Sequence, residues 1–462
     1  MFNEQAANPL ESVDPGWAWA AFEPSPDQPW SLDLAAHLYR RAVFGGNWEQ
    51  LQRSVAAGPQ ETVDELMAAT PENSSFYKQA SRSLESLVGG GGVQHLPAWW
   101  LYTMVSAPNP LVDRIALFWH GHFATSAAKV TDARLMHQQH LLLRKHALGK
   151  FGPMLKELAQ DPAMLLWLDS AVNRKSHPNE NFAREVMELF SLGIGNYTEA
   201  DIREAARAFT GWEVRQNAFR INKRQHDEGG KTVMGQSGDW NGDDVIRILL
   251  SQPAAAQFIV KKLFRALINE TSSPPASLVE GLAGEYRTRD YDNAWLVSTV
   301  LRSNLFFSPL AVRQRIKGPV EFAVGLLRSL EGATNMYSLA EDLRAMGQGV
   351  FYPPNVKGWD GGEEWINSAT LLARANLVWE MVSGADNRYG QKVPLAAIIQ
   401  RYAGDTPADS ARWLAELLLG TPAPNAVSIQ LAALAGDTSG SQQLRAARLV
   451  QAIATLPEYQ LS

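Results

Sequence analysis

The chain has 462 residues and a formal charge of −6 at pH 7; 45% of its residues are hydrophobic and 19% are charged. These values are typical of a folded protein with a large core. The mild negative charge, without any long Lys/Arg run, argues against non-specific binding of nucleic acid. The chain contains no cysteine, which excludes disulfides, thiolate metal ligands, iron–sulfur clusters and a cysteine nucleophile.

The first 30 residues are rich in Pro, Glu and Asp and are predicted to form an extension on the surface. Residues 1–17 contain no apolar stretch of the kind that signal peptides carry. The sequence as written therefore predicts a cytoplasmic protein, whereas a periplasmic or exported location would follow if a leader had been removed. No run of about 18 apolar residues is present, so no membrane insertion is predicted.

Apolar residues recur with helical spacing over most of the remaining chain. The predicted helices cover residues 31–41, 47–69, 109–119, 161–168, 198–209, 243–250, 253–269, 292–303, 315–330 and a series beyond 367. No series of strands and no internal repeat of fixed period is found. We therefore predict an all-α fold, with one large multi-helix domain over residues 31–462 and long Gly/Pro/Trp-rich loops. The helices from about residue 393 are assigned to the same unit.

Residues 178–190 are predicted to form a helix with a polar stripe. At 100° per residue, four polar side chains fall on one narrow strip, and the opposite side is apolar. These four are Asn181, Arg184, Glu185 and Glu188. A mostly buried helix with such a stripe can form the floor of a polar cleft. The alternative is a solvated stripe in which Arg184 pairs with Glu180 and Glu188 at i,i+4.

Two histidines, His120 and His122, follow the helix predicted over 109–119. Both side chains could turn toward one point if Gly121 ended the helix in the left-handed conformation. Because imidazole is the commonest metal ligand, this pair is a candidate site for a divalent metal ion. The alternative is one histidine in the core and one at the helix end.

Asp169 closes the helix predicted over 161–168. Only a short loop separates it from Glu185 in the polar stripe. We therefore treat Asp169 as a candidate for the same site.

A glycine-rich loop over residues 215–242 is a candidate for substrate binding, because long loops inside helical domains usually carry function. Its candidate residues are His226, Asp227 and Lys231. The loop matches neither a phosphate-binding loop nor a complete EF-hand loop.

A second loop, over residues 347–365, is rich in Pro, Gly and Trp. Its rings Trp359 and Trp365 are predicted to line a cleft, because aromatic side chains bind extended polymers as well as packing in cores. Arg374 lies on the helix that follows and is a further candidate for substrate binding.

Several blocks of the sequence together carry a family resemblance. The most specific runs from Asn-Glu-Asn-Phe-Ala-Arg-Glu at 179–185 to Ala-Phe-Thr-Gly-Trp at 208–212. The other blocks are residues 35–45, 118–123, 161–169, 226–231, 353–365 with Arg374, and 457–460. In these blocks the chain resembles the bacterial family catalogued as domain of unknown function 1800. The resemblance covers nearly the whole chain and implies one predominantly helical domain without an established activity.

Members of that family often carry export signals and are similar in genomic setting to a sulfatase-like companion family. The resemblance therefore implies a role in the cell envelope, on polysaccharides, with a sulfatase-like companion protein as a partner. The present chain departs from the family pattern because it shows no leader.

The first functional hypothesis is a hydrolase that acts on a polyhydroxylated or anionic, polysaccharide-like substrate in a polar cleft. In a metal-assisted form, His120 and His122 hold Zn, Mn or Fe beside Glu185 and Glu188, and the metal activates water. Without a metal, Glu185 and Glu188 act as an acid/base pair, with Asp169 nearby. Substrate binding is assigned to Asn181, Arg184, His226, Asp227, Lys231, Trp359, Trp365 and Arg374.

The second hypothesis is a non-catalytic scaffold or a polymer-binding partner protein. In this case the Glu/Arg stripe fixes helix packing, because a buried charge is costly unless it is paired. Trp359 and Trp365 then form a binding platform. The two hypotheses differ in whether the stripe lines an open pocket or is paired inside the helical bundle.

Overall fold

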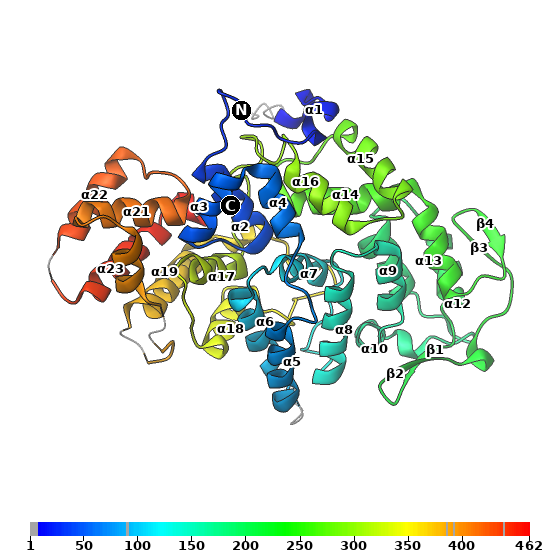
Figure 1. The fold of residues 1–462 in the computed structure, drawn as a ribbon. Helices are drawn as coiled ribbons and strands as arrows, with labels where there is room; N and C mark the ends of the chain where they lie inside the picture. Colours follow the sequence, from blue (N-terminus) through cyan, green and yellow to red (C-terminus); the bar gives the residue numbers. More distant parts are fainter. Residues whose placement is uncertain (1–7, 89–91, 385–386, 391–392, 438) are drawn as a thin grey trace, which may run out of the picture.

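A computed structural model describes residues 8–88, 92–384, 387–390, 393–437 and 439–462 (Figure 1). Within these ranges the chain forms one large helical body with two small two-stranded sheets at one edge. The prediction of an all-α fold is therefore confirmed. None of the described helices is long and apolar enough to cross a membrane.

The segment before residue 31 lies along the body and is not wholly extended. It contains the short helix α1 (Pro15–Trp19), which contacts α16 (Asn293–Arg302). The N–H of Phe22 donates to the carbonyl of Arg302 (2.7 Å), and the Phe22 ring is buried. Apolar burial and backbone hydrogen bonds thus attach the described part of this segment to the helical body.

The first half of the body consists of helices joined by connections of different lengths. They are α2 (Leu32–Val43), α3 (Trp48–Ala57), α4 (Pro59–Met67), α5 (Ser75–Val88), α6 (His95–Ser106), α7 (Leu111–His122), α8 (Ala133–His146), α9 (Phe151–Ala159), α10 (Pro162–Trp167), α11 (Asn181–Glu185) and α12 (Glu199–Ala208). The helix predicted over 47–69 is two helices, α3 and α4. It breaks because Gly58 has a φ of +91° and Pro59 cannot continue the hydrogen bonding of the preceding helix.

The second half contains the remaining helices. They are α13 (Gly242–Ser251), α14 (Pro253–Leu267), α15 (Ala276–Thr288), α16, α17 (Pro319–Ser329), α18 (Met336–Ala345), α19 (Ser368–Ser383), α20 (Leu395–Tyr402), α21 (Pro407–Leu419), α22 (Asn425–Gly436), α23 (Gln442–Ala454) and α24 (Pro457–Gln460). Short 3-10 turns lie at Pro9–Ser12, Ser170–Val172, Lys223–Gln225 and Gly362–Trp365, and Val186–Ser191 is a π-helical turn. The C-terminal helices pack on one another and reach the rest of the body through α17 and α19.

The helix predicted over 315–330 begins only at Pro319, the first residue of α17. Pro at the first helical position is favourable because its missing N–H is not needed there. Arg315 therefore lies before the helix, where its side chain reaches two carboxylates of the cleft described below.

Two short hairpins replace the irregular structure expected for residues 215–242. The first pairs β1 (Trp212–Arg215) with β2 (Ala218–Ile221), and the second pairs β3 (Lys231–Val233) with β4 (Gln236–Gly238). Each turn has two central residues with positive φ, as a two-residue hairpin turn of type I′ requires. The strands have only three or four residues, which is too short to give a clear alternating pattern.

A buried acid near the start of α7 fixes this helix in the core. The Asp113 side chain is fully buried and accepts hydrogen bonds from Trp100 Nε1 (3.0 Å) and the Tyr77 hydroxyl (2.6 Å). It also pairs with Arg144. These partners lie on α5, α6 and α8, so a single satisfied carboxylate joins three helices to α7.

The loop over residues 347–365 touches the other end of α7. Gly358 has a φ of +84°, and a Cβ at this position would lie 2.1 Å from the carbonyl oxygen of Gly121. Only glycine fits here, because the backbone conformation and the close approach both exclude a side chain. The contact places the next residue, Trp359, against the His120 ring, with centroids 5.5 Å apart.

Candidate functional site: a basic cleft beside helix α7

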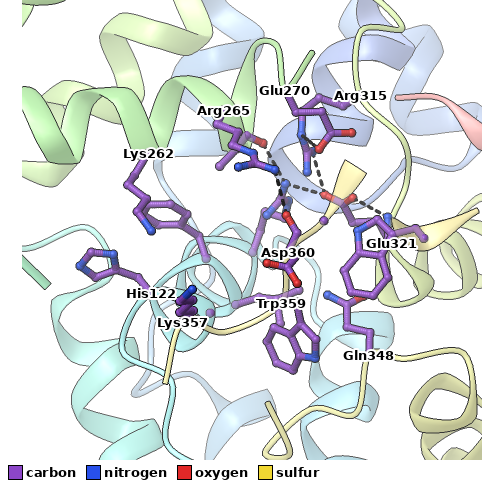
Figure 2. Close-up of a pocket in the computed structure, with 18 residues that line it drawn as sticks. His122, Lys262, Arg265, Glu270, Arg315, Glu321, Gln348, Lys357, Trp359 and Asp360 are labelled. Carbon is purple, nitrogen blue, oxygen red and sulfur yellow. Dashed lines mark hydrogen bonds and ion pairs between the residues drawn. The ribbon is translucent and has the colours of Figure 1, made fainter. Parts of the chain in front are cut away.

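A cleft of about 230 Å³ opens between one face of α7, α14, the start of α17 and the loop over residues 347–365 (Figure 2). Five Lys and Arg side chains and three carboxylates line it. The charged lining residues are Arg114, Lys262, Arg265, Arg315, Lys357, Glu270, Glu321 and Asp360. The other polar or aromatic lining residues include His122, Gln348, Trp359 and Trp365.

Glu321 is the centre of a buried ion-pair network in the cleft. Its Oε1 lies 2.6 Å from Arg114 Nη2 and 3.1 Å from Arg315 Nη1, and its Oε2 accepts the N–H of Gly318 (3.1 Å). Burial alone would raise the pKa of Glu321, but the two guanidiniums outweigh burial and hold the pKa at about 2. The Glu321 carboxylate is therefore ionised at neutral pH. We assign it a framework role, which means that it holds the segments around the cleft together and does not bind a ligand.

Glu270 completes this network. Its Oε1 accepts the N–H of Ile316 (2.5 Å), and its Oε2 lies 3.7 Å from Arg315 Nε. The side chain is 5% exposed. Glu321 pairs with Arg114 and Arg315, and Glu270 pairs with Arg315, so the negative and positive charges in this part of the cleft compensate one another.

The cations on the other sides of the cleft are not compensated in this way. Within the described ranges, Lys262, Arg265 and Lys357 form no ion pair with a carboxylate. Arg265 Nη2 donates to the backbone carbonyl of Asp360 (2.9 Å), and burial together with the charge of Arg265 lowers the pKa of Lys262. Figure 2 shows Lys262 and His122 on one side of the cleft, and Glu321 and Gln348 on the other.

Four buried polar atoms of cleft residues lack a hydrogen-bond partner in the described part of the chain: Trp359 Nε1, His122 Nδ1, and the Nε atoms of Arg114 and Arg315. The two guanidiniums are paired through their other nitrogens, which leaves Trp359 Nε1, a donor, and His122 Nδ1. His122 Nε2 must donate to the carbonyl of Phe190 (3.0 Å), so the neutral ring presents Nδ1 as an acceptor. Since buried polar groups are nearly always paired, these two atoms mark a place where a ligand or water would bind.

Gly121 does not break the helix, so the condition for a shared metal site is not met and the two histidines do not converge. Helix α7 continues through Gly121 to His122. His120 Nε2 accepts the N–H of Phe351 (3.0 Å), whereas His122 Nε2 faces Phe190. Burial lowers the pKa of both rings to about 3, so both are neutral at pH 7.

The ligand set predicted for Zn, Mn or Fe is therefore not assembled. The described residues contain no group of three or more His, Cys, Asp or Glu side chains that could hold a metal ion. His120 is a core histidine, which agrees with the alternative interpretation of this pair. His122 is the member of the pair that lines the cleft.

The polar stripe lies on α11 and on the π-helical turn that follows it, Val186–Ser191. The predicted pair of Arg184 with Glu180 is present (3.4 Å). Arg184 binds Glu199 in a bidentate manner (2.8 Å for both contacts) and not Glu188 as the second predicted pair required. Asn181 is exposed at the start of α11.

The two glutamates of the stripe have different surroundings. Burial and then Glu188 raise the pKa of Glu185, while Arg184 and Lys357 act in the opposite direction. Glu188 accepts a hydrogen bond from the Tyr197 hydroxyl (2.5 Å). Neither glutamate lines the basic cleft, but Lys357 does, and its charge acts on Glu185.

Asp169 is exposed, and its carboxylate pairs with Lys129 (2.8 Å). Its backbone carbonyl accepts the side-chain amide of Asn179 (3.1 Å). These contacts connect Asp169 to the surface on the N-terminal side of α11 and not to the lining of the cleft.

The predicted residues of the 215–242 segment stabilise their own loop. Asp227 binds Arg207 through both carboxylate oxygens (2.8 and 3.2 Å), and His226 Nδ1 lies 2.9 Å from the carbonyl of Thr210. Lys231 donates to two backbone carbonyls of the loop, including that of Asp227 (2.6 Å). None of these side chains lines the basic cleft.

The candidate residues of the second loop, over residues 347–365, do lie at the cleft, in contrast to those of the first loop. Trp359 and Trp365 both line the cleft, as expected of rings that wall a cleft. Arg374 is buried and donates to Gln460 Oε1 (2.9 Å) and to the carbonyl of Lys317 (2.7 Å). It therefore connects α24 to the segment before α17 and does not line the cleft.

The cations of the cleft were not among the residues predicted from the sequence. Lys262 and Arg265 have the spacing i,i+3 on α14 and therefore share one helix face, which could have indicated a basic surface. Lys357 and Asp360 lie next to Trp359 in the loop that was already a candidate. Glu321 was not predicted, because Arg114 is 207 residues away in the sequence and Arg315 was expected to lie inside the same helix and not before it.

Comparison with known proteins gives one family. A family model described as "Protein of unknown function (DUF1800)" matches residues 37–461. No curated protein and no solved structure gives a significant match.

The ion-pair network predicts a large effect of Glu321→Gln on stability. The change leaves two buried guanidiniums without their shared carboxylate, so we expect a loss of about 3 kcal/mol in the free energy of unfolding at pH 7. Because the pKa of Glu321 in the folded protein is about 2, below its ordinary value of 4.5, the carboxylate's contribution is complete above pH 4.5. It is lost as the pH falls through 2.

Chemical unfolding followed by circular dichroism measures the effect. Glu199→Gln is the matched control, because Glu199 also binds an arginine in a bidentate manner but at the surface. Equal stabilities of the two variants, or a difference between wild type and Glu321→Gln that does not shrink below pH 4.5, would contradict the framework role of Glu321.

Proposed function

This chain belongs to the DUF1800 family of proteins of unknown function, and we propose that its basic cleft binds an acidic ligand rich in hydroxyl groups, of the polysaccharide kind. One observation carries the proposal. Lys262, Arg265 and Lys357 line one cleft and, among the described residues, have no carboxylate partner.

The charge of the cleft supports an anionic ligand. The glutamates Glu270 and Glu321 compensate Arg114 and Arg315, so the three remaining cations face only one further carboxylate, that of Asp360. A cleft with an excess of one sign of charge attracts ligands of the other sign. A carboxylate or sulfate group of the ligand would supply the missing partner through charge-assisted hydrogen bonds.

The other lining groups support a ligand with hydroxyl groups. The carboxyl oxygens of Asp360 can accept hydrogen bonds from the hydroxyl groups of a ligand. Trp359 Nε1 and His122 Nδ1 are a donor and an acceptor without partners. A hydroxyl group can both donate and accept, so a sugar ring that carries an acidic group matches this mixture.

The resemblance described above leads independently to polysaccharides. A sulfatase-like companion would act on sulfated substrates, and sulfated sugar chains are acidic and rich in hydroxyl groups. We therefore propose a polysaccharide as the ligand and a sulfatase-like companion protein as a partner of this chain.

The binding proposal predicts that the wild-type protein binds a tetramer of galacturonic acid and not a neutral oligosaccharide of the same length. Lys262→Gln and Arg265→Gln should each weaken binding about 10-fold or more, because each removes a hydrogen bond to a charged group. Burial and Arg265 lower the pKa of Lys262 below 10.5, and only the protonated amine binds an anion. Affinity should therefore fall as the pH rises through this lowered pKa.

Isothermal titration calorimetry at fixed ionic strength measures these affinities. Lys145→Gln is the control, because Lys145 is an exposed cation that pairs with Glu157 and does not line the cleft. Binding of the neutral oligosaccharide with equal affinity, or equal losses in all three variants, would contradict the proposal.

A hydrolase is the second candidate function, and the surroundings of Glu185 favour it. Burial raises the pKa of Glu185, as a proton donor needs, and Glu188 differs from it by accepting a hydrogen bond from the Tyr197 hydroxyl. Lys357 connects Glu185 electrostatically to the cleft. The proposed reaction is hydrolysis of a glycosidic bond in the acidic chain, with Glu185 as the proton donor.

Release of reducing ends from the bound acidic oligosaccharide tests this second candidate. Glu185→Gln should lower the rate by about 10²–10⁴-fold, the usual contribution of a general acid. Glu363→Gln, an exposed glutamate in the loop over residues 347–365, should leave the rate unchanged. An oligosaccharide that binds the wild-type protein but is not cleaved would refute the hydrolase and leave the binding function in place.

A further inference from the structure

A second hollow lies beside the basic cleft, on the same helix. It has a volume of about 360 Å³ and shares Lys262, Arg265 and Glu270 with the cleft. Its remaining lining residues are Phe258, Lys261, Asn269, Ser272, Ser273 and Pro274. The two hollows therefore lie next to each other along α14, and together they are called the depression below.

The second hollow also has an excess of positive charge. Lys261, Lys262 and Arg265 line it, and in the described part of the chain Lys261 forms no ion pair. The single carboxylate of this hollow, Glu270, is held by Arg315 and by the N–H of Ile316. Lys261 and Arg265 are four residues apart on α14, so they lie on one face about 6 Å apart along the helix axis.

From this arrangement we propose that the depression holds an extended acidic sugar chain, with one acidic group in the cleft and a second in the hollow beside it. Lys357 and Lys262 bind the first group, and Lys261 and Arg265 bind the second. The inference rests on the proposed function and specifies its ligand as an oligomer with acidic groups on at least two sugar units.

The lining favours a sugar chain over a nucleic acid strand. Single-stranded nucleic acid is usually held by several aromatic rings on which successive bases stack. In the cleft, the depression has the rings of Phe118, Trp359 and Trp365, of which Trp365 is buried. In the second hollow, Phe258 is the aromatic lining residue, and its ring is in contact with Lys262. The hydroxyls of Ser272 and Ser273 and the carboxylate of Asp360 instead offer partners to sugar hydroxyls.

The two-site arrangement is tested by titrating the full-length protein with galacturonic acid and with its tetramer. The tetramer should bind at least about 10-fold more tightly than the monomer, since its second acidic group binds without a further loss of translational freedom. Lys261→Gln should remove most of this gain and leave the affinity for the monomer unchanged, because Lys261 lines only the outer hollow. Lys145→Gln again serves as the control.

The results distinguish the further inference from the proposed function. Equal affinities for monomer and tetramer, with no effect of Lys261→Gln, would overturn the two-site arrangement while leaving the acidic ligand in place. Failure of both galacturonate ligands to bind would overturn both proposals. A single-stranded oligonucleotide of the same charge that binds as tightly as the tetramer would overturn the choice of a sugar chain.

Discussion

The pairing of Glu321 with Arg114 and Arg315 is the constraint on which the cleft depends. The three charged groups come from α17, from α7 and from the segment before α17, and they meet where water is largely excluded. None of them can stay ionised in the core alone, because an unpaired buried charge costs several kcal/mol. The network therefore requires these three segments to come together in one arrangement, and Glu270 extends it to the end of α14.

This constraint divides the charges of the cleft into two groups. The compensated group, Arg114, Arg315, Glu270 and Glu321, holds the structure together. If one of these side chains bound a ligand and left its partner, that partner would remain as an unpaired charge in a low-dielectric environment, which is costly. The uncompensated group, Lys262, Arg265 and Lys357, projects from α14 and from the Trp-rich loop. Ligand binding is therefore assigned to the second group, and the hollow that contains Lys261 extends it along α14.

Much of the fold could be predicted from the sequence, because helical periodicity is local. Capping residues such as Asn47 and Asp161 mark helix starts that the structure shows. The position of Trp359 in a loop was also predictable, since several Pro and Gly residues prevent a long helix over residues 347–361. The break between α3 and α4 was missed although Gly58-Pro59 carries its signal, and the hairpins were missed because their strands are very short.

The site was less predictable, because its geometry depends on contacts between distant parts of the chain. The two histidines were a candidate metal pair, but α7 continues through Gly121 and each Nε2 binds a backbone group elsewhere. Similarly, Arg184 has Glu199 as its partner and not the nearer Glu188. Spacing along one helix cannot show which of several acids a long side chain reaches once the loops are folded.

A crystal structure of the protein with a tetramer of galacturonic acid would test the central claim most directly. The account predicts one carboxylate of the ligand within hydrogen-bonding distance, about 2.7–3.2 Å, of Lys262, Arg265 or Lys357. It also predicts a sugar hydroxyl at the unpartnered Nε1 of Trp359 or Nδ1 of His122. A ligand bound at another surface, with the cleft containing only solvent at saturating concentration, would contradict the assignment of the cleft as the binding site.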